Sequence, residues 1–186
     1  MKNAFRSGPR LWFRPLEAEH APTIQTWFND PENTQYLKRF RPISLLEEKQ
    51  WLEKAPERKD EHHFEIVLRE GERLIGICSL HDGGLPSRSA ELGIAIGERE
   101  EQGKGYGEEA LRLLLEYGFA TLGLHRIGLN VYENNPRAIR CYEKCGFRRE
   151  GVRREARWWA GRWWSILEYG ILEHEWQSLS PRNAAK

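Results

Sequence analysis

The sequence has 186 residues and a mass of 21.9 kDa, which is the size of one domain rather than two. Hydrophobic residues make up 39% of it and charged residues 31%, so the chain can bury a core and does not belong to the disordered class. Its formal net charge is +1, which excludes a protein that binds nucleic acid through an overall basic surface.

Targeting signals and cysteines point to the cytoplasm. No stretch approaches the roughly 18 apolar residues of a membrane-spanning helix, and the opening residues lack the apolar core of a secretory signal. Cys78, Cys141 and Cys145 are an odd number, which argues against a disulfide framework. Cys141 and Cys145 would share a helix face, but no nearby Cys or His completes a set of four metal ligands. We therefore expect reduced thiols, no metal and no membrane contact.

The first half of the chain predicts helices between strands. Periodicity and turn residues indicate a strand at 11–16, a helix around 24–28, a helix from 45 that ends before 56, and strands at 63–68 and 74–80. Ser44 with Glu47 has the spacing of a capping box at the second helix. The polar segment 69–73 predicts an antiparallel hairpin between the last two strands. We interpret His62 and His63 as polar residues at a strand entry, without a catalytic role.

The second half predicts a strand, helix, strand unit and a closing hairpin. Its pattern indicates a strand at 90–97, an amphipathic helix at 108–122, a strand at 126–132, a short helix at 136–145, strands at 153–159 and 163–172, and a frayed tail after 177. The strands at 90–97 and 126–132 should be parallel, joined by a right-handed crossover, so the sheet is mixed. Asn135 and Pro136 predict the start of the short helix, and Gly146 its end.

The most informative segment is the glycine-rich loop at 98–107, which joins a strand to a helix. Gly103, Gly105 and Gly107 allow main-chain N–H groups to converge, and the helix N-terminus adds partial positive charge, so a pyrophosphate can bind there with Lys104 as a further cation. The loop has neither the Gly-Lys-Ser/Thr of a P-loop nor the G-x-G-x-x-G spacing, which disfavours ATP and NAD. The alternative is a surface turn that feeds a helix.

The strand before this loop has one nearly bare face. Alternation places Leu92, Ile94 and Ile96 on one side, and the other side carries small residues except for Glu91. Glycine within a strand often marks close approach of a ligand or of another backbone. An extended, amide-bearing ligand along this strand is one interpretation, and tight packing of the following helix is the other.

Two segments resemble motifs of the GNAT N-acetyltransferase superfamily. Gln102-Gly103-Lys104-Gly105-Tyr106-Gly107 resembles its Q/R-x-x-G-x-G/A acyl-CoA loop, and Asn135 to Phe147 resembles its N-x-x-A-x-x-x-Y-x-K-x-G-F segment. The element order over about residues 10–175 is similar to the GNAT fold, particularly the ribosomal-protein N-terminal and spermidine acetyltransferase branches. The resemblance implies a single α/β (α+β) domain over 1–186, with a mixed central sheet of about seven strands and helices on both faces.

The resemblance also implies acetyl-CoA as cosubstrate and assigns roles to particular residues. The pantetheine amides would lie along Ala95, Ile96 and Gly97, and the pyrophosphate in the loop made by Gln102, Gly103, Lys104, Gly105, Tyr106 and Gly107. Asn135 would contact the pantetheine arm, although the N-cap role alone explains its presence. Tyr142 would protonate the departing thiolate as general acid, and the alternative is a ring that is merely packed on its helix.

The general base is less well defined by the sequence. Glu91 is the candidate, because it lies on the bare face of the strand and can accept a proton through a water. The alternative is a glutamate that is simply solvated at a sheet end. Some related N-terminal acetyltransferases carry a glutamate where this chain has Asn130.

Charge and aromatic patterns bear on the acceptor. Residues 137–162 contain nine basic and three acidic side chains, and residues 17–70 contain eight basic and twelve acidic ones, which would attract an amine. Four tryptophans flank one turn and could form an acceptor wall, a dimer contact or a cross-strand aromatic ladder: Trp158, Trp159, Trp163 and Trp164.

The sequence thus predicts acetyl transfer from acetyl-CoA to a primary amine by direct attack. A protein N-terminal amine is the first choice, with a ribosomal protein as the corresponding partner. A polyamine or other small amine is the alternative, and an acyl-CoA-binding or ribosome-associated module is the non-enzymatic one. The sequence leaves the oligomeric state open, with a homodimer as one option, and direct DNA binding is not expected.

Overall fold

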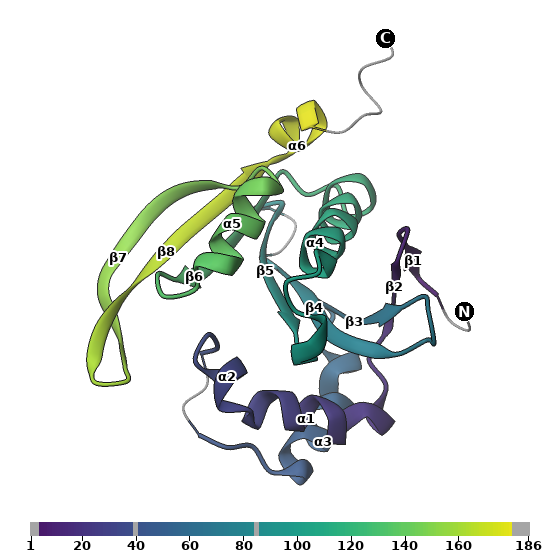
Figure 1. Cartoon of the computed structure of the whole chain (residues 1–186). Helices are drawn as coiled ribbons and strands as arrows, with labels where there is room; N and C mark the ends of the chain where they lie inside the picture. Colours follow the sequence, from purple (N-terminus) through teal and green to yellow (C-terminus); the bar gives the residue numbers. More distant parts are fainter. Residues whose placement is uncertain (1–3, 39–40, 84–85, 180–186) are drawn as a thin grey trace.

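The computed structural model describes residues 4–38, 41–83 and 86–179. In this part of the chain eight strands form one mixed sheet, in the order β1-β2-β3-β4-β5-β6-β8-β7 (Figure 1). The strands are β1 (Arg6–Ser7), β2 (Leu11–Pro15), β3 (Glu61–Leu68), β4 (Leu74–Asp82), β5 (Ser89–Ile96), β6 (Arg126–Tyr132), β7 (Arg148–Trp159) and β8 (Arg162–Leu172). The helices are α1 (Ala21–Asn29), α2 (Pro31–Thr34), α3 (Leu45–Lys54), α4 (Tyr106–Glu116), α5 (Pro136–Lys144) and α6 (Glu173–Leu179).

Helices cover both faces of the sheet, because successive strand residues point to opposite sides. Phe13 and Leu11 of β2 belong to the core cluster that α4 completes, whereas Trp12 between them belongs to a second cluster with α1 and α3. Figure 1 shows α1 and α3 together on the side away from α4. The predicted two-sided arrangement is confirmed. No helix in the described segments is long and apolar enough to cross a bilayer.

The sheet opens between its two parallel strands. β5 and β6 pair only from Ser89 with Arg126 to Glu91 with Gly128, whereas β6 pairs with β8 along its whole length. Beyond Glu91 the edge of β5 has no strand partner on the β6 side within the described residues. This divergence provides an entry into the sheet for a ligand.

Helix boundaries follow the local signals predicted from the sequence. Ser44 and Glu47 form the capping box of α3, and the side chain of Asn135 caps α5. Gly146 has a φ of +94°, which suits a glycine just past a helix end. At the predicted end of the long helix, α4 widens into a π-helical segment at Tyr117–Thr121.

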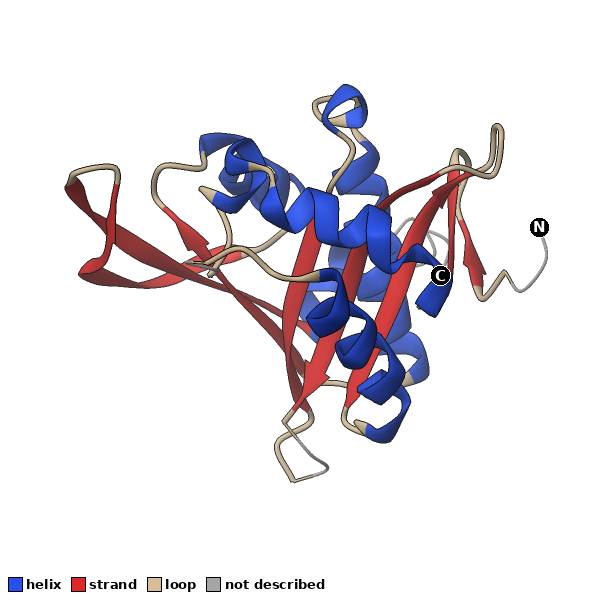
Figure 2. Cartoon of the chain, turned by 90° about the horizontal axis from the view of Figure 1, so that it is seen from below, coloured by secondary structure: helices blue, strands red, loops and turns tan. Residues whose placement is uncertain are grey.

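The main departures from prediction are in the polar elements. β1 and α2 were not predicted, and β7 begins at Arg148 rather than Arg153. The first residues of β7 are exposed and charged, so main-chain pairing with β8 holds them without an apolar pattern. Figure 2 shows the β7–β8 hairpin reaching out beyond the helices. The helix α6 runs to Leu179, past the predicted start of the tail, and the rest of that tail lies outside the described residues.

Candidate active site

A cavity of about 730 Å³ occupies the space where β5 and β6 diverge. Its walls come from α1, the segment around α2, β4, β5, the glycine-rich loop, β6 and α5. Most of the site residues predicted from the sequence line it: Glu91, Ala95, Ile96, Gly97, Gln102, Gly103, Gly105, Gly107, Asn135 and Tyr142. The structure therefore brings the two sequence motifs, which are about 30 positions apart, to one cavity.

The bare face of β5 lies against α1 rather than against the helix that follows it. A Cβ atom added to Gly97 would lie 2.0 Å from the ring of Trp27, and one added to Gly93 would lie 2.8 Å from Oγ of Ser79. Protein packing therefore explains these two glycines without a ligand. The alternative that the following helix packs on these glycines is wrong, because their neighbours are Trp27 of α1 and Ser79 of β4.

The side chain of Gln102 fixes the glycine-rich loop in place. Its Nε2 donates to the carbonyl oxygen of Ile96 at 2.8 Å and to Oδ1 of Asn33 at 2.9 Å. Nδ2 of Asn33 in turn donates to the carbonyl oxygen of Gly97 at 3.1 Å. Asn33 was missed by the sequence analysis, because the contact joins α2 to a loop 69 positions away. These bonds hold the loop against the end of β5.

The loop leaves main-chain groups open toward the cavity. Gly103 and Gly105 have φ values of +80° and +85°, which favour glycine, and the space beside Gly103 is open. Gly105 is the N-cap of α4 and supplies no capping side chain. First-turn amides of a helix without a side-chain cap attract anions. The geometry therefore fits the pyrophosphate of a coenzyme.

Lys104 and Tyr106 are the two predicted site residues that do not line the cavity. Nζ of Lys104 bonds to Oε2 of Glu101 at 3.0 Å. The ring of Tyr106 lies 4.6 Å from the guanidinium carbon of Arg10, whose NH1 also donates to the carbonyl oxygen of Lys104 at 3.0 Å. Both side chains therefore support the back of the loop. Other cations line the cavity, Lys38 and three residues of α5: Arg137, Arg140 and Lys144.

Asn135 and Tyr142 lie on α5 at the side of the gap. Oδ1 of Asn135 accepts from the amide of Ala138 at 3.1 Å, so the amide NH₂ is left for the cavity. Tyr142 is buried edge-on against Phe147, with 5.9 Å between ring centroids. Its hydroxyl has no hydrogen-bond partner in the described part of the chain. Burial raises the pKa of Tyr142, so the phenol keeps its proton at neutral pH.

Glu91 forms an exposed ion pair with a primary ammonium on the cavity wall, since the side chains of Lys38 and Glu91 are 65% and 51% exposed. Its Oε1 lies 3.3 Å from Nζ of Lys38 and 3.0 Å from Nδ2 of Asn130, which is itself oriented by Arg153 at 2.9 Å. Burial raises the pKa of Glu91, but the bond from Asn130 and the charge of Lys38 outweigh it, so the net pKa is below the ordinary value. The free protein therefore presents Glu91 as an ionised carboxylate.

The basic segment 137–162 is not a uniform solvated edge. Arg157 is buried, with its guanidinium carbon 3.8 Å from the ring of Tyr132. It donates to the carbonyl oxygens of Gln35 at 2.6 Å and Leu37 at 3.2 Å, and desolvation lowers its pKa. A register shift between Arg153 and Arg157 turns this side chain inward. The residue ties β7 to the segment that leads to Lys38.

The tryptophan cluster at the β7–β8 turn does not contribute to the cavity wall. Trp158 and Trp163 are paired across the strands with centroids 5.2 Å apart, and they are 54% and 53% exposed. Trp164 is covered by Arg162, whose guanidinium carbon lies 3.5 Å from its ring centroid. The ladder interpretation is right for the first pair, and the acceptor-wall interpretation is wrong.

Comparison with known proteins agrees with this geometry. A family model described as an acetyltransferase (GNAT) domain matches residues 10–148. The spermidine N(1)-acetyltransferase of Vibrio cholerae is 34% identical over 126 residues, which cover 67% of this chain and 65% of that protein. A protein of Bacillus licheniformis named as the uncharacterized N-acetyltransferase p20 is 30% identical over 146 residues, 77% of this chain and 82% of that one.

Solved structures show the same fold. The spermidine N-acetyltransferase from Vibrio cholerae in complex with CoA and spermine has a TM-score of 0.85 and 30% identity, and the match covers 91% of this chain and 99% of that one. A dodecameric structure of spermidine N-acetyltransferase from the same organism has a TM-score of 0.79 and 28% identity, with 96% and 100% covered. The predicted GNAT fold is confirmed. The chain belongs to the GNAT acetyltransferase family and is an acetyl-CoA-dependent N-acetyltransferase.

Proposed function

We propose that this chain acetylates a small cationic amine of the polyamine class. The observation that carries the proposal is the ion pair between Lys38 and Glu91, since this exposed carboxylate on the wall of the cavity already pairs with a primary ammonium. Two of the relatives described above are named as spermidine acetyltransferases. A protein N-terminal amine was the first choice from the sequence, and these relatives favour the small-amine alternative instead.

The hydrogen bonds from Arg157 to the carbonyl oxygens of Gln35 and Leu37 support a short acceptor. They join β7 to the segment 35–37, and Leu37 and Lys38 line the acceptor side of the cavity. A polyamine needs only room for a thin, flexible cation and a carboxylate to bind it.

Direct attack then needs one proton acceptor and one proton donor. The acceptor nitrogen forms a C–N bond to the thioester carbonyl carbon, and the C–S bond breaks. The departing sulfur takes the phenolic proton of Tyr142, which burial keeps in place until that step. The nitrogen of the new amide releases one proton, and the phenolate regains a proton through solvent, so the phenol is restored.

Glu91 is the proposed proton acceptor of the reaction. Burial pushes the pKa of Glu91 up in the free protein, and Asn130 and Lys38 hold it down. An incoming ammonium that displaces Lys38 brings the same positive charge, so Glu91 stays ionised when the acceptor binds. The carboxylate then takes a proton from that ammonium through a water, and the neutral amine attacks the thioester. Glu91 is thus both the ammonium anchor and the base.

Competition between acceptors tests the proposal. Acetyl-CoA is offered to the protein with equal concentrations of spermidine and of a peptide that begins with Ala or Ser, and both products are quantified by mass spectrometry. We expect acetylated spermidine to dominate. If the peptide is acetylated and spermidine is not, the acceptor is a protein N-terminal amine instead.

A pair of variants tests the acceptor subsite with opposite signs. Lys38→Met removes the competing ammonium, so the KM for the polyamine should fall by about two- to fivefold, as expected for a partly exposed ion pair of up to about 1 kcal/mol. Glu91→Gln should raise that KM and lower kcat. If both variants shift the KM in the same direction, Lys38 does not compete with the acceptor.

Self-association is a separate part of the proposal. The sequence left the oligomeric state open with a homodimer as one option, and a related enzyme has been solved as a dodecamer. We propose that this chain also assembles with copies of itself. Light scattering coupled to gel filtration should give a mass that is a multiple of 21.9 kDa, and a purely monomeric peak at micromolar concentration contradicts it.

A further inference from the structure

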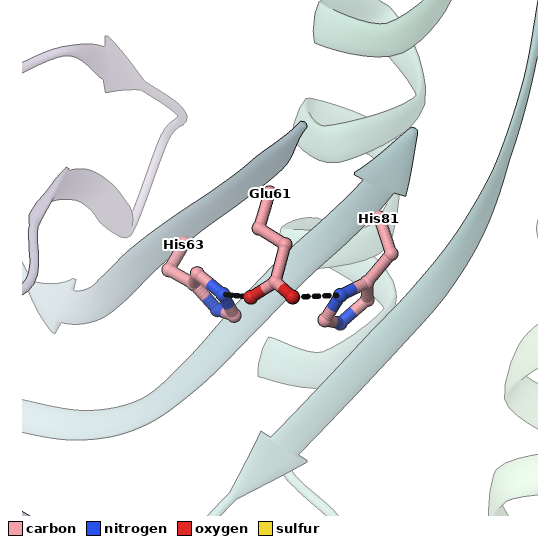
Figure 3. A group of neighbouring side chains, drawn as sticks. All are labelled: Glu61, His63 and His81. Carbon is pink, nitrogen blue, oxygen red and sulfur yellow. Dashed lines mark hydrogen bonds and ion pairs between the residues drawn. The ribbon is translucent and has the colours of Figure 1, made fainter. Parts of the chain in front are cut away.

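A cluster of two histidines and one glutamate lies beside the acceptor end of the cavity. Glu61 and His63 come from β3, and His81 comes from β4 (Figure 3). The strand register pairs Glu61 with His81 and His63 with Ser79, so all four side chains leave the same face of the sheet. Figure 3 shows the carboxylate of Glu61 between the two imidazoles.

The donor atoms of the three residues converge. One ligand atom from each lies within 4.8 Å of the others. Nε2 of His63 is 2.7 Å from Oε2 of Glu61, and Nδ1 of His81 is 3.8 Å from Oε1. The second distance is too long for a hydrogen bond. Zinc bonds of about 2.0–2.2 Å in a tetrahedral site place donor atoms about 3.3–3.5 Å apart. The side chains need to shift only slightly to reach that geometry.

The outer contacts favour metal binding by His81. Its Nε2 is 3.0 Å from Oγ of Ser79, which leaves Nδ1 facing Glu61. Histidine ligands typically donate their second ring nitrogen to a polar group, which fixes the tautomer and the ring orientation. His63 is held by an edge-on contact with Trp51, at 5.0 Å between centroids. The two imidazoles are therefore oriented before any ion binds.

One contact opposes the ion. NH1 of Arg58 lies 3.3 Å from Oε2 of Glu61. Both side chains are about 30% exposed, and ion pairs of that kind contribute little to stability. The guanidinium also stacks on Trp51, at 4.9 Å, and can keep that contact when it releases the carboxylate.

We propose that Glu61, His63 and His81 form a binding site for a late first-row divalent cation such as Zn²⁺. Two imidazoles and a carboxylate suit this class of metal, and three protein ligands leave a fourth position for water. His81 lines the cavity and is the register partner of Glu91. A bound cation therefore adds positive charge next to the carboxylate that holds the acceptor ammonium.

The consequence for catalysis rests on the proposed function. Occupancy of the site should raise the KM for the amine and leave the KM for acetyl-CoA unchanged, because the glycine-rich loop lies at the other end of β5. The binding itself does not depend on which amine is the acceptor. Binding and kinetics are therefore tested separately.

Calorimetric titration with zinc sulfate tests the binding. The protein is purified without a histidine tag and treated with a chelator, and we expect one Zn²⁺ per chain. Glu61→Gln and His81→Ala should each weaken binding at least tenfold. His174→Ala is the control, because it removes an exposed imidazole on α6. Cys141→Ser tests the rival thiol site of Cys141 and Cys145.

Each result of this titration is decisive. Absence of binding in the wild type, or binding that survives in His81→Ala and is lost in Cys141→Ser, overturns the proposal. Circular dichroism of each variant verifies folding, and the partly exposed His81 is the substitution with the least effect on the core.

Kinetics then test the consequence. Zinc should raise the KM for the amine in the wild type and have no effect in His81→Ala. If zinc binds as predicted but the wild-type KM is unchanged, the link between the metal and the acceptor end is wrong while the site itself stands. If no polyamine is turned over at all, the proposed function fails, and the calorimetric result is unaffected.

Discussion

At the scale of single residues, the proposed mechanism depends on the phenol of Tyr142 as proton donor. Tyr142 packs edge-on to Phe147, and its hydroxyl has no hydrogen-bond partner in the described part of the chain. Burial raises the pKa of Tyr142, so the acid form persists through the neutral range.

Replacing Tyr142 with Phe removes the acid and little else. We expect kcat to fall by about 10²- to 10⁴-fold, as for the loss of a general acid, with the KM for acetyl-CoA nearly unchanged. Stability should change little, since the lost hydroxyl has no hydrogen bond to lose within the described residues. Steady-state kinetics and thermal melting measure both. An unchanged kcat would remove Tyr142 from the mechanism.

The pH profile gives an independent check on the same residue. The reaction needs the protonated phenol, so kcat should fall only when Tyr142 loses its proton. Because burial raises that pKa, the basic limb assigned to Tyr142 should lie above the ordinary value of about 10 for tyrosine. A limb that persists unchanged in Tyr142→Phe belongs to another group.

At the scale of elements, the glycine-rich loop is the proposed binding site for the pyrophosphate. Gly103 has a φ of +80° and open space around it, so a methyl group fits sterically but the backbone angle is strained. Gly71, in the β3–β4 turn, has a φ of +72° and equally open surroundings. The two positions differ only in their distance from the cavity, which makes them a matched pair.

Alanine at these two glycines should separate strain from binding. Gly103→Ala and Gly71→Ala should each destabilise the fold by about 1 kcal/mol, the cost of a left-handed non-glycine residue. Only Gly103→Ala should raise the KM for acetyl-CoA, because it turns loop amides away from the pyrophosphate. Equal KM values in the two variants would show that the loop does not bind the coenzyme.

The β7–β8 hairpin is the second element that shapes the site. Arg157 reaches across from it to the carbonyl oxygens of Gln35 and Leu37, and so fixes the segment before Lys38. Arg154, three positions earlier on the same strand, is exposed. Arg154 is therefore an exposed arginine that serves as the control for the buried Arg157.

Arg157→Met should loosen the acceptor side of the cavity. We expect a several-fold higher KM for the amine and an unchanged KM for acetyl-CoA, because the tie holds only the acceptor wall. Loss of the buried hydrogen bonds should also lower the free energy of unfolding by about 1–3 kcal/mol. Arg154→Met should change neither quantity. A rise in the KM for acetyl-CoA instead would place Arg157 on the coenzyme side.

At the scale of the whole molecule, the sheet opens where the parallel strands β5 and β6 stop pairing. Only three residue pairs join β5 to β6, and the cavity begins where that pairing stops. α1 and α2 close the opening on one side, and α5 on the other. The coenzyme and acceptor ends of one cavity are thus assembled from elements that are distant in sequence.

That long-range assembly sets the limit of what the sequence can predict. Short-range signals were sufficient for the capping box at Ser44, the start of α5 at Asn135 and the glycine-rich loop, because each is written within a few residues. The contacts of Asn33 and Lys38 depend on where α2 is placed against β5. No local pattern encodes that placement.

Strand pairing also brings together residues that the sequence alone does not link. His63 was correctly placed on a strand, but its companions Glu61 and His81 meet it only through the pairing of β3 with β4. The start of β7 was missed because Arg148 and its neighbours have no apolar alternation. Predictions from one sequence are therefore most accurate for motifs whose residues lie close together in the chain.

Hydrogen–deuterium exchange with and without CoA is the most direct test of where the coenzyme lies. The account predicts protection in three segments: residues 95–97, 102–107 and 135–142. The segment 61–63, on the acceptor side of the molecule, should exchange at the same rate in both states. Protection that appears elsewhere and spares the glycine-rich loop would contradict the assignment of the gap between β5 and β6 as the coenzyme site.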